Sequence, residues 1–347
     1  MMNFKPSLNI HHFLTFVYLV ICPQQLLHAA APWVEHRPGG ETRCARGEAF
    51  SFFHNPGSQN KIIIDFIGGG ACWDGMTCQP GSQTFFDSID AVREEQKNGL
   101  DGIYRKDSSD NPFKDWTHVV IPYCTGDVHW GKNDISYETM RGEEFVIHHR
   151  GASNAAAVIR WVADNYQPED VLITGCSAGA YGSVFWTPEI RKVFPNANMA
   201  QFGDSGAGII PELFFEHLNQ VWKPFLSAPE WIPGVNPNNI DWSHMTLNQY
   251  YEAVLASHSD VFMSQFHHTE DQIQQFFYEL MMGDPQEWAT QLKDSMSELQ
   301  QNSHFKAVMR PGRTHCVLPE AEFLESKDGK PSVANWLYEY MQIQNKS

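Results

Sequence analysis

Hydrophobic residues along the chain follow two patterns, and their alternation predicts the fold. Apolar runs of strand length lie at residues 61–67, 117–123, 170–175, 198–204, 260–266 and 305–310. Between or after them, apolar residues recur at helical spacing over 153–166, where Ser153 is a candidate N-cap, and over 272–281 and 332–343. Strands that are apolar almost throughout and alternate with helices are typical of a parallel sheet covered on both faces. We therefore predict an α/β fold with a mostly parallel sheet and helices on both of its faces.

The strand pattern stops between residues 206 and 259. Phe, Trp and Pro are frequent there, as in PELFFEHLNQVWKPFLSAPEWIPGVNP. We interpret residues 206–259 as a helical cap inserted between two strands of a single domain, which would span residues 31–347. The aromatic side chains of this cap suit core packing and equally the wall of an acyl or sugar pocket.

Residues 1–30 have the three parts of a secretory signal peptide. Lys5 precedes the apolar run 13–21, and the small residues 29–31 follow it as a candidate cleavage site. A membrane anchor is the alternative, but it would need about 20 apolar residues, which this run does not supply. We expect a protein that is secreted, either extracellular or periplasmic, and that has no membrane contact after cleavage.

Charge and cysteine content narrow the choice of partners and compartment. With 24 Lys and Arg against 41 Asp and Glu, the formal net charge is -17, which disfavours nucleic acid and anionic membranes as partners. Of seven cysteines, Cys22 lies in the signal peptide, and the other six allow up to three disulfides in an oxidising compartment. Cys72 and Cys78 are close enough in sequence to form a local loop, so we predict that pair.

The sequence offers little to a metal ion. It contains neither paired Cys-x-x-Cys motifs nor two histidines at the spacing of a zinc site. Asp127 and His129 in GDVHWG are a possible ligand pair, but a loop at the rim of the site, held by local hydrogen bonds, is the better interpretation. We interpret HHR (148–150) as a segment that leads into a helix, not as a ligand pair.

The stretch VLITGCSAGAYGS (171–183) contains the pattern Gly-x-Ser-x-Gly, centred on Ser177. It directly follows a predicted strand, and the flanking glycines permit the tight strand-to-helix turn that exposes a nucleophilic serine. Small residues also gather in ordinary turns, so the pattern alone is weak. Ser177 becomes a candidate nucleophile if a base, an acid and an oxyanion site accompany it in a workable order.

A base and an acid lie downstream, each in a loop that follows a predicted strand. His315 in PGRTHC can act as general base because imidazole titrates near neutrality. Asp271 in HHTEDQ is our candidate for the carboxylate that orients this histidine. The order Ser177, Asp271, His315 is the order found in α/β-hydrolases. Three other acids remain open as alternatives to Asp271: Glu270, Asp260 and Asp204, of which the last suits a structural turn better.

A glycine-rich loop, IGGGACW (67–73), follows the strand predicted at 61–67. Loops in this position supply backbone N–H groups to the oxyanion of a tetrahedral intermediate, and glycine lets the substrate approach the backbone. Gly68, Gly69 and Gly70 are the candidates, together with the N–H of Ala178 just after the nucleophile.

Several of these motifs together resemble the pectin acetylesterase family: FIGGGACW, NPFKDWTHVVIPYCTGDVHWG, HRGASNAAAVIRWV, VLITGCSAGAYGS and GDSGAG. That family also contains the Notum-type carboxylesterases, which remove fatty acyl groups from secreted signalling proteins. The similarity covers residues 44–315 and is densest over 61–208. It implies an α/β-hydrolase fold, extracellular ester hydrolysis, and a triad of Ser177, Asp271 and His315.

The resemblance also implies oxyanion donors at Gly68, Gly69 and Ala178, with a one-residue ambiguity that includes Gly70. Ala71 departs from the plant members, which usually carry a large aromatic residue there, and the stretch after Asp204 is divergent. Because such loops shape the pocket, the substrate is the least transferable property.

We therefore expect a monomeric secreted serine esterase that needs no metal or organic cofactor. By resemblance, its leading substrate is an acetylated polysaccharide, although the net charge disfavours a bare polyuronate. One alternative is a carboxylesterase or lipase-like deacylase that acts on longer acyl esters. The other is a non-catalytic, secreted glycan-binding protein on a hydrolase scaffold.

Overall fold

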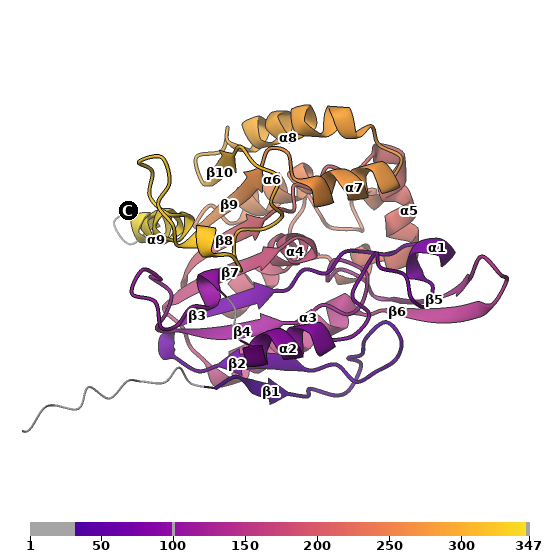
Figure 1. The fold of residues 1–347 in the computed structure, drawn as a ribbon, viewed down its shortest axis with the longest axis horizontal. Helices are drawn as coiled ribbons and strands as arrows, with labels where there is room; N and C mark the ends of the chain where they lie inside the picture. The colour runs from indigo at the N-terminus through magenta and orange to yellow at the C-terminus, as the bar shows by residue number, and fades with distance from the viewer. Residues whose placement is uncertain (1–31, 99–100, 345–347) are drawn as a thin grey trace, which may run out of the picture.

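The structure, a computed structural model, describes residues 32–98 and 101–344, so the predicted signal peptide lies outside the described residues. Its centre is an eight-stranded sheet in the order β1-β2-β4-β3-β7-β8-β9-β10 (Figure 1). The strands of this sheet are β1 (Val34–His36), β2 (Phe52–Asn55), β3 (Ser58–Phe66), β4 (Trp116–Ile121), β7 (Asp170–Cys176), β8 (Asn198–Asp204), β9 (Val261–His268) and β10 (Phe305–Arg310). From β4 to β10 along this order the neighbours are parallel, while β1 and β2 add an antiparallel edge. The predicted, mostly parallel sheet is confirmed.

Two further strands, β5 (Asn133–Glu138) and β6 (Glu144–His149), form an antiparallel hairpin that projects from the body of the molecule (Figure 1). The prediction that residues 148–150 lead into a helix is confirmed, since His148 and His149 end β6 and a helix starts directly after Arg150. Alternating half-buried and exposed residues along β5 give it the period of a strand with one face towards the protein.

The helices are α1 (Gly75–Cys78), α2 (Asp90–Asn98), α3 (Gly151–Asn165), α4 (Ala178–Val193), α5 (Glu212–Trp222), α6 (Leu247–Ser257), α7 (Gln272–Leu280), α8 (Pro285–Leu299) and α9 (Val333–Gln344). Short 3-10 turns lie at η1 (Gly102–Tyr104), η2 (Pro224–Ser227), η3 (Trp242–His244) and η4 (Ala321–Phe323).

The start of α3 corrects one prediction. The helix begins at Gly151, two residues before Ser153, and its N-cap residue Arg150 makes no side-chain cap bond. A carboxylate from another loop caps this helix instead, because Asp127 Oδ2 accepts the Gly151 N–H at 2.8 Å. The cap is therefore supplied by tertiary structure, which local sequence does not reveal.

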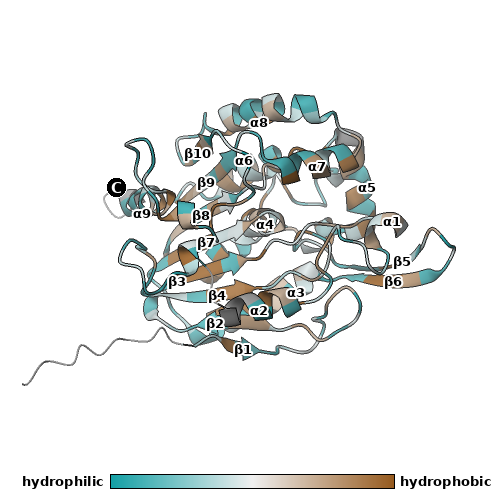
Figure 2. Ribbon diagram, in the orientation of Figure 1, coloured by the Kyte–Doolittle hydropathy of each residue, from teal (hydrophilic) through white to brown (hydrophobic). Residues whose placement is uncertain are grey.

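Both faces of the sheet are covered, as the apolar strands predicted. Successive strand residues point to opposite faces, so Val171 and Ile173 pack in one hydrophobic cluster and Leu172 in another. Helix α4 covers the first face against β3, β7 and β8, and α9 packs against β8 on the second. Figure 2 shows this pattern, with hydrophobic colour in the central strands and a largely hydrophilic α8.

The segment 206–259, predicted as a helical insertion, contains α5, α6 and two 3-10 turns between β8 and β9. Its second half belongs to the helical layer on the sheet, because Tyr250 in α6 stacks on Phe185 in α4 and donates a hydrogen bond to its carbonyl. Its first half lies over the site described below. Among the described residues, we find no helix that combines the length and apolarity needed to cross a bilayer.

Three disulfides join the six cysteines of the described residues: Cys44–Cys124, Cys72–Cys78 and Cys176–Cys316. The predicted local pair Cys72–Cys78 is among them. The other two close long loops that sequence spacing did not assign.

Candidate active site

Ser177 lies on the sharp turn between β7 and α4. Its backbone has φ 57° and ψ -124°, a conformation that residues other than glycine rarely adopt. A Cβ on Gly179 would lie 1.7 Å from the carbonyl oxygen of Phe66, so only glycine allows the helix to start this close to β3. The turn is held by the Ser177 N–H, which donates to the Asp204 carbonyl at 2.8 Å. This strained turn presents a half-buried serine at the carboxyl end of the sheet.

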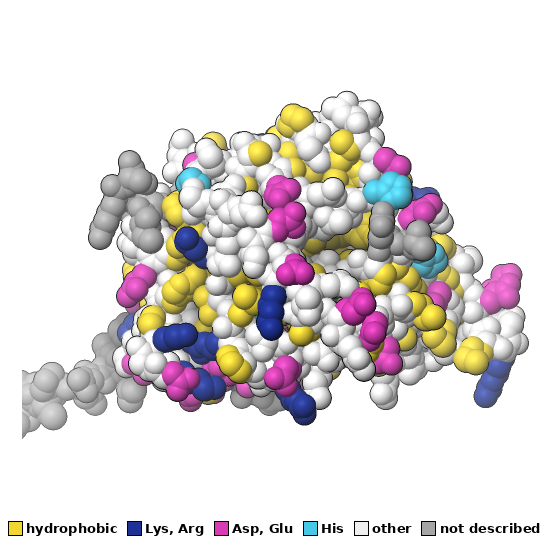
Figure 3. All heavy atoms as spheres, turned by 90° about the horizontal axis from the view of Figure 1, so that it is seen from above, with side chains coloured by type: hydrophobic (Ala, Val, Ile, Leu, Met, Phe, Trp, Pro, Cys, Tyr) yellow, Lys and Arg dark blue, Asp and Glu magenta, His cyan; other side chains and the backbone are white. Residues whose placement is uncertain are grey.

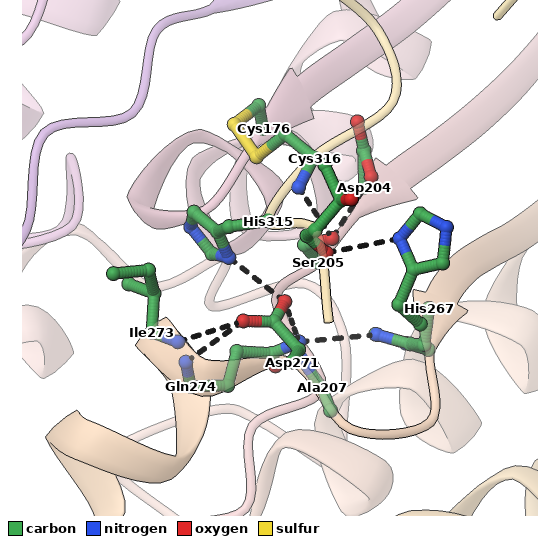
Figure 4. Close-up of polar contacts among 12 residues, drawn as sticks. Cys176, Asp204, Ser205, Ala207, His267, Asp271, Ile273, Gln274, His315 and Cys316 are labelled. Atoms are coloured by element: carbon green, nitrogen blue, oxygen red, sulfur yellow. Dashed lines mark hydrogen bonds and ion pairs between the residues drawn. A yellow bond between two sulfur atoms is a disulfide. The ribbon is translucent and has the colours of Figure 1, made fainter. Parts of the chain in front are cut away.

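His315 and Asp271 are in direct contact. The imidazole Nδ1 lies 2.8 Å from Asp271 Oδ2, and the carboxylate is fully buried (Figure 4). Asp271 is also the N-cap of α7, where its Oδ1 accepts the N–H groups of Ile273 and Gln274 at 3.0 and 3.1 Å. The Gln274 side chain donates to Oδ2 at 3.0 Å.

These contacts set the charge of the pair. Burial raises the pKa of Asp271, but the hydrogen bond from His315 and those from Gln274 outweigh it, so the pKa is lowered overall. An ionised carboxylate on Nδ1 requires a proton there, which leaves Nε2 of neutral His315 as the basic nitrogen. In the described part of the chain, no hydrogen-bond partner is found for this buried Nε2.

The rival acids lie elsewhere. Glu270 pairs with exposed Arg313, and Asp260 pairs with Arg191. Asp204 is buried and its Oδ2 accepts the backbone N–H groups of Val317 and Leu318, consistent with the structural role expected for it.

Ser177 and His315 lie where two hollows meet. The inner one is an apolar cavity of about 70 Å³. Its walls include Trp73, Trp130, Trp222, Trp288, Ile209, Ile210, Leu218, Ile273, Phe277 and Met281. The cap segment predicted from the sequence supplies Ile209, Ile210, Leu218 and Trp222.

The contribution of α7 and α8 to this cavity was missed by sequence reasoning. Ile273, Phe277 and Met281 in or beside α7 are spaced four residues apart and so share one face of the helix, with Trp288 from α8 beside them. Apolar residues at this spacing, directly after the candidate acid Asp271, could have indicated a cavity wall in the sequence. The same spacing equally fits a helix that packs on the core.

The outer hollow is an open cleft of about 430 Å³. It is lined by the three glycines after β3 and by Gln83, Thr84, Phe85, Phe86, Tyr104, Ile273, Phe276, Phe277 and Pro319, among others. Phe86 and Phe276 at this cleft are 48% and 49% exposed, so the cleft presents two large apolar rings to the solvent. Of the described residues that line the cleft, none is Lys or Arg. Figure 3 shows hydrophobic side chains exposed across the middle of one face, among scattered charged ones.

The glycines after β3 lie against the Ser177 turn. A Cβ on Gly68 would lie 2.5 Å from the Cys176 carbonyl oxygen and 2.9 Å from the Ser177 Cβ. The Gly69 carbonyl accepts the Phe86 N–H at 2.9 Å, and since C=O and N–H of a trans peptide point in opposite directions, the Gly70 N–H points away from Phe86. Gly70 lines the inner cavity with Ser177 and Ala178, whose own N–H at the start of α4 has no acceptor within the helix. Of the three glycines, only Gly70 lines both hollows.

The GDVHWG loop is held by local hydrogen bonds. Asp127 accepts from the Thr125 hydroxyl, from the His129 N–H and from the Gly151 N–H. His129 Nε2 donates to the Ile67 carbonyl at 2.9 Å, just before the glycines. Burial raises the pKa of Asp127 to about 6 and lowers that of His129 to about 4. Val128 and Trp130 of this loop line the inner cavity, as a rim position predicts.

Two groups of His and Cys atoms in the described residues have spacing that would suit a metal ion: Cys72, Cys78 and His149, and Cys176, His315 and Cys316. In each group the two cysteines form a disulfide with one another. A metal is bound by cysteine thiolate, which a disulfide does not supply.

The order of these elements defines a class of protein. A mostly parallel sheet with Ser177 after β7, Asp271 after β9 and His315 after β10 is the arrangement of the α/β-hydrolase fold. Solved structures agree: two crystal forms of the Wnt deacylase Notum from Drosophila superpose with a TM-score of 0.66 each. They share 16% and 17% sequence identity with this chain, and the match covers 92% of this chain and 94% and 95% of theirs.

The chain belongs to the pectinacetylesterase family, because the model of that family matches residues 30–212, more than half of its 347 residues. It is 27% identical over 157 residues to the palmitoleoyl-protein carboxylesterase NOTUM of Schmidtea mediterranea, and 25% identical over 170 residues to pectin acetylesterase 7 of Arabidopsis thaliana. These alignments cover 43% and 47% of this chain, and 28% and 42% of the relatives. The chain thus matches less than half the length of either relative.

Proposed function

We propose that this chain is a secreted serine esterase that hydrolyses esters of short acyl groups, with O-acetyl groups on a polysaccharide as the leading substrate. The observation that carries the proposal is the position of Ser177 and His315 between a small apolar cavity and a wide, open cleft. The cavity would hold the acyl group and the cleft would hold the alcohol part of the ester.

The reaction would run through an acyl-enzyme. Ser177 Oγ attacks the ester carbonyl carbon while His315 Nε2 takes its proton, and Asp271 holds the imidazole and stabilises the imidazolium. The backbone N–H groups of Ala178 and Gly70, or of Gly68 and Gly69, stabilise the oxyanion. His315 then protonates the departing alkoxide, and water, activated by the same histidine, releases the acid from Ser177.

Cavity size supports a short acyl group. A cavity of about 150 Å³ in another protein holds one benzene ring, so a cavity of about 70 Å³ suits an acyl group of two to three carbons. An acetyl group fits, whereas a long fatty chain would have to displace the buried Trp288 or its neighbours. Of the activities named for the two relatives, acetyl ester hydrolysis therefore matches the cavity better than palmitoleoyl ester hydrolysis.

The cleft supports an uncharged alcohol part. With no Lys or Arg among its described lining residues and a net charge of -17, it offers a polyuronate no cation. Exposed Phe86 and Phe276 present flat apolar surface to the bound molecule. An acetylated neutral stretch of polysaccharide suits this surface better than a bare polyanion.

Two assays test the proposal. Hydrolysis of p-nitrophenyl esters is measured for the wild type and for Ser177→Ala, and acetate release is measured from a panel of acetylated polysaccharides. We expect turnover of acetate that Ser177→Ala abolishes, and release from at least one polysaccharide. Turnover that survives Ser177→Ala would refute the triad, and a preference for long acyl chains would favour the deacylase. No turnover on any ester, with tight glycan binding, would favour the binding protein.

A further inference from the structure

The turns that carry Ser177 and His315 are both bonded to one buried pair of residues, Asp204 and Ser205, at the end of β8. The Asp204 carbonyl accepts the Ser177 N–H at 2.8 Å. On the other side, Asp204 Oδ2 accepts the N–H groups of Val317 and Leu318 at 2.6 and 2.7 Å. The two residues therefore connect the turn of the nucleophile with the chain that follows the base.

Ser205 reinforces this connection. Its hydroxyl accepts the Cys316 N–H at 3.0 Å and donates to Asp204 Oδ1 at 3.1 Å (Figure 4). Its own N–H donates to the Phe266 carbonyl in β9, which fixes the pair to the sheet. Both side chains are at most 1% exposed.

A covalent bond joins the same two turns. The Cys176–Cys316 disulfide connects the residue before Ser177 to the residue after His315 across 140 positions of sequence. Figure 4 shows the disulfide beside the Asp204 and Ser205 contacts. The nucleophile and the base are thus each one residue away from the same cross-link.

Backbone conformation indicates that these bonds are needed. Ser177, Ser205 and Cys316 all have positive φ, at 57°, 56° and 66°. Residues with a Cβ rarely adopt this region, and they stay in it only where the surrounding structure holds them. All three belong to the cluster that the disulfide and the Asp204 and Ser205 contacts join.

The loop of His315 is held separately at its other end. His268 Nδ1 lies 2.9 Å from the Thr314 carbonyl, and the Glu270 N–H donates to Gly312 at 2.9 Å. These bonds tie His315 to the segment that carries Asp271. The bonds to Asp204 and Ser205, together with the disulfide, tie it to the segment that carries Ser177.

We propose that Asp204, Ser205 and the Cys176–Cys316 disulfide are positioning residues that set the imidazole of His315 against the hydroxyl of Ser177. The inference rests on the esterase function proposed above. The upstream bonds hold His315 against Asp271, and the downstream cluster sets where Nε2 of His315 lies relative to the Ser177 hydroxyl. Loss of the downstream cluster should slow the chemical step and leave substrate binding intact.

The test compares two pairs of cysteine substitutions. In the folded, oxidised protein, Cys176→Ala/Cys316→Ala removes the cross-link beside the triad. Cys44→Ala/Cys124→Ala removes one that also closes a long loop, 80 against 140 residues, and whose cysteines line neither hollow. The kcat and KM for p-nitrophenyl acetate are measured with the thermal midpoint of each variant. We expect kcat of the first pair to fall about 10- to 100-fold with KM within twofold. The control pair should keep kcat within twofold of the wild type.

Two single substitutions keep the test decisive if a cysteine pair does not fold. Asp204→Ala removes the two carboxylate oxygens that accept bonds from Val317, Leu318 and Ser205. The kcat of this variant should therefore fall about 10- to 100-fold, as in the Cys176/Cys316 pair. Asp204→Asn should restore most of kcat, because an amide oxygen still accepts the Val317 and Leu318 N–H groups. A purely structural role would not give this pattern of lost kcat, unchanged KM and rescue.

The outcomes separate the inference from the proposed function. An active wild type with kcat unchanged in the Cys176/Cys316 and Asp204→Ala variants would overturn the inference alone. Equal losses of kcat in the two cysteine pairs would also overturn it. An inactive wild type would overturn both the proposed function and this inference.

Discussion

Replacement of Trp288 by alanine would extend the inner cavity behind Ser177, so this substitution tests how cavity size sets acyl preference. Trp288 lies in α8, is 1% exposed and lines the cavity. Burial of one methylene stabilises a bound acyl chain by about 0.8 kcal/mol, which is about a fourfold gain in kcat/KM. In the wild type, with its cavity of about 70 Å³, kcat/KM should rise about fourfold from the acetate to the propionate ester and change little from propionate to butyrate. From the hexanoate ester onward, kcat/KM should fall.

In Trp288→Ala, the space left by the indole should move the ester with the highest kcat/KM to hexanoate or octanoate. Up to that length, kcat/KM should rise about fourfold for each added methylene. The substitution should also lower the free energy of unfolding by about 3–5 kcal/mol, the usual cost of a buried Trp→Ala change. The assay is kcat/KM on p-nitrophenyl esters from acetate to decanoate, at a temperature where the variant is folded.

Trp116→Ala is the matched control. Trp116 is equally buried but packs in the cluster on the other face of the sheet, so it should lower stability without changing the chain-length profile. The reasoning is refuted if the wild type prefers decanoate to butyrate. It is also refuted if folded Trp288→Ala keeps the wild-type profile.

Three further predictions concern the acid, a disulfide and pH. Asp271→Asn keeps a side-chain oxygen to cap α7 but no longer holds Nδ1–H of His315, so kcat for p-nitrophenyl acetate should fall about 10³- to 10⁴-fold. In the control Glu270→Gln, kcat should stay within twofold of the wild type. Similar losses of kcat in both variants would contradict the assignment of Asp271 as the acid. Removal of Cys44–Cys124, which closes a loop of 80 residues, should lower the free energy of unfolding by about 4–5 kcal/mol. Removal of Cys72–Cys78, which closes a loop of 6 residues, should lower it by about 2 kcal/mol. Chemical denaturation measures both changes, and a larger loss of stability for Cys72–Cys78 would contradict the prediction. Burial raises the pKa of Asp204 from 3.8 to about 6, so its contribution to stability is full below about pH 4 and is lost as pH rises through 6. Asp204→Asn lacks this loss, so its free energy of unfolding relative to the wild type should rise by up to about 3 kcal/mol from pH 4 to pH 7, and a difference that is constant with pH would refute this.

Features of the fold that depend on local pattern could be read from the sequence. The run 198–204 coincides with β8, which is buried along almost its whole length, and the run 305–310 coincides with β10 at the edge of the sheet. The turn at Ser177 was also predictable, because the glycines on either side of the serine permit a tight turn between a strand and a helix.

Features that depend on contacts between distant residues could not. Glu270 and Asp271 are neighbours in sequence, yet only the register of β9 against β10 turns Asp271 towards His315 and leaves Glu270 with Arg313. The start of α3 depends on Asp127, 24 positions away, and the six cysteines allowed 15 pairings.

The sequence by itself determined the parallel strands β3, β4 and β7 to β10, the helices α3, α7 and α9, and the order of the candidate nucleophile, acid and base. The tertiary structure alone decided which acid meets His315, which cysteines pair beside Ser177, and how far the cavity extends behind it. The reason is physical: periodicity and turn chemistry act over a few residues, whereas packing, cross-links and hydrogen bonds to buried carboxylates join residues that only the folded chain brings together.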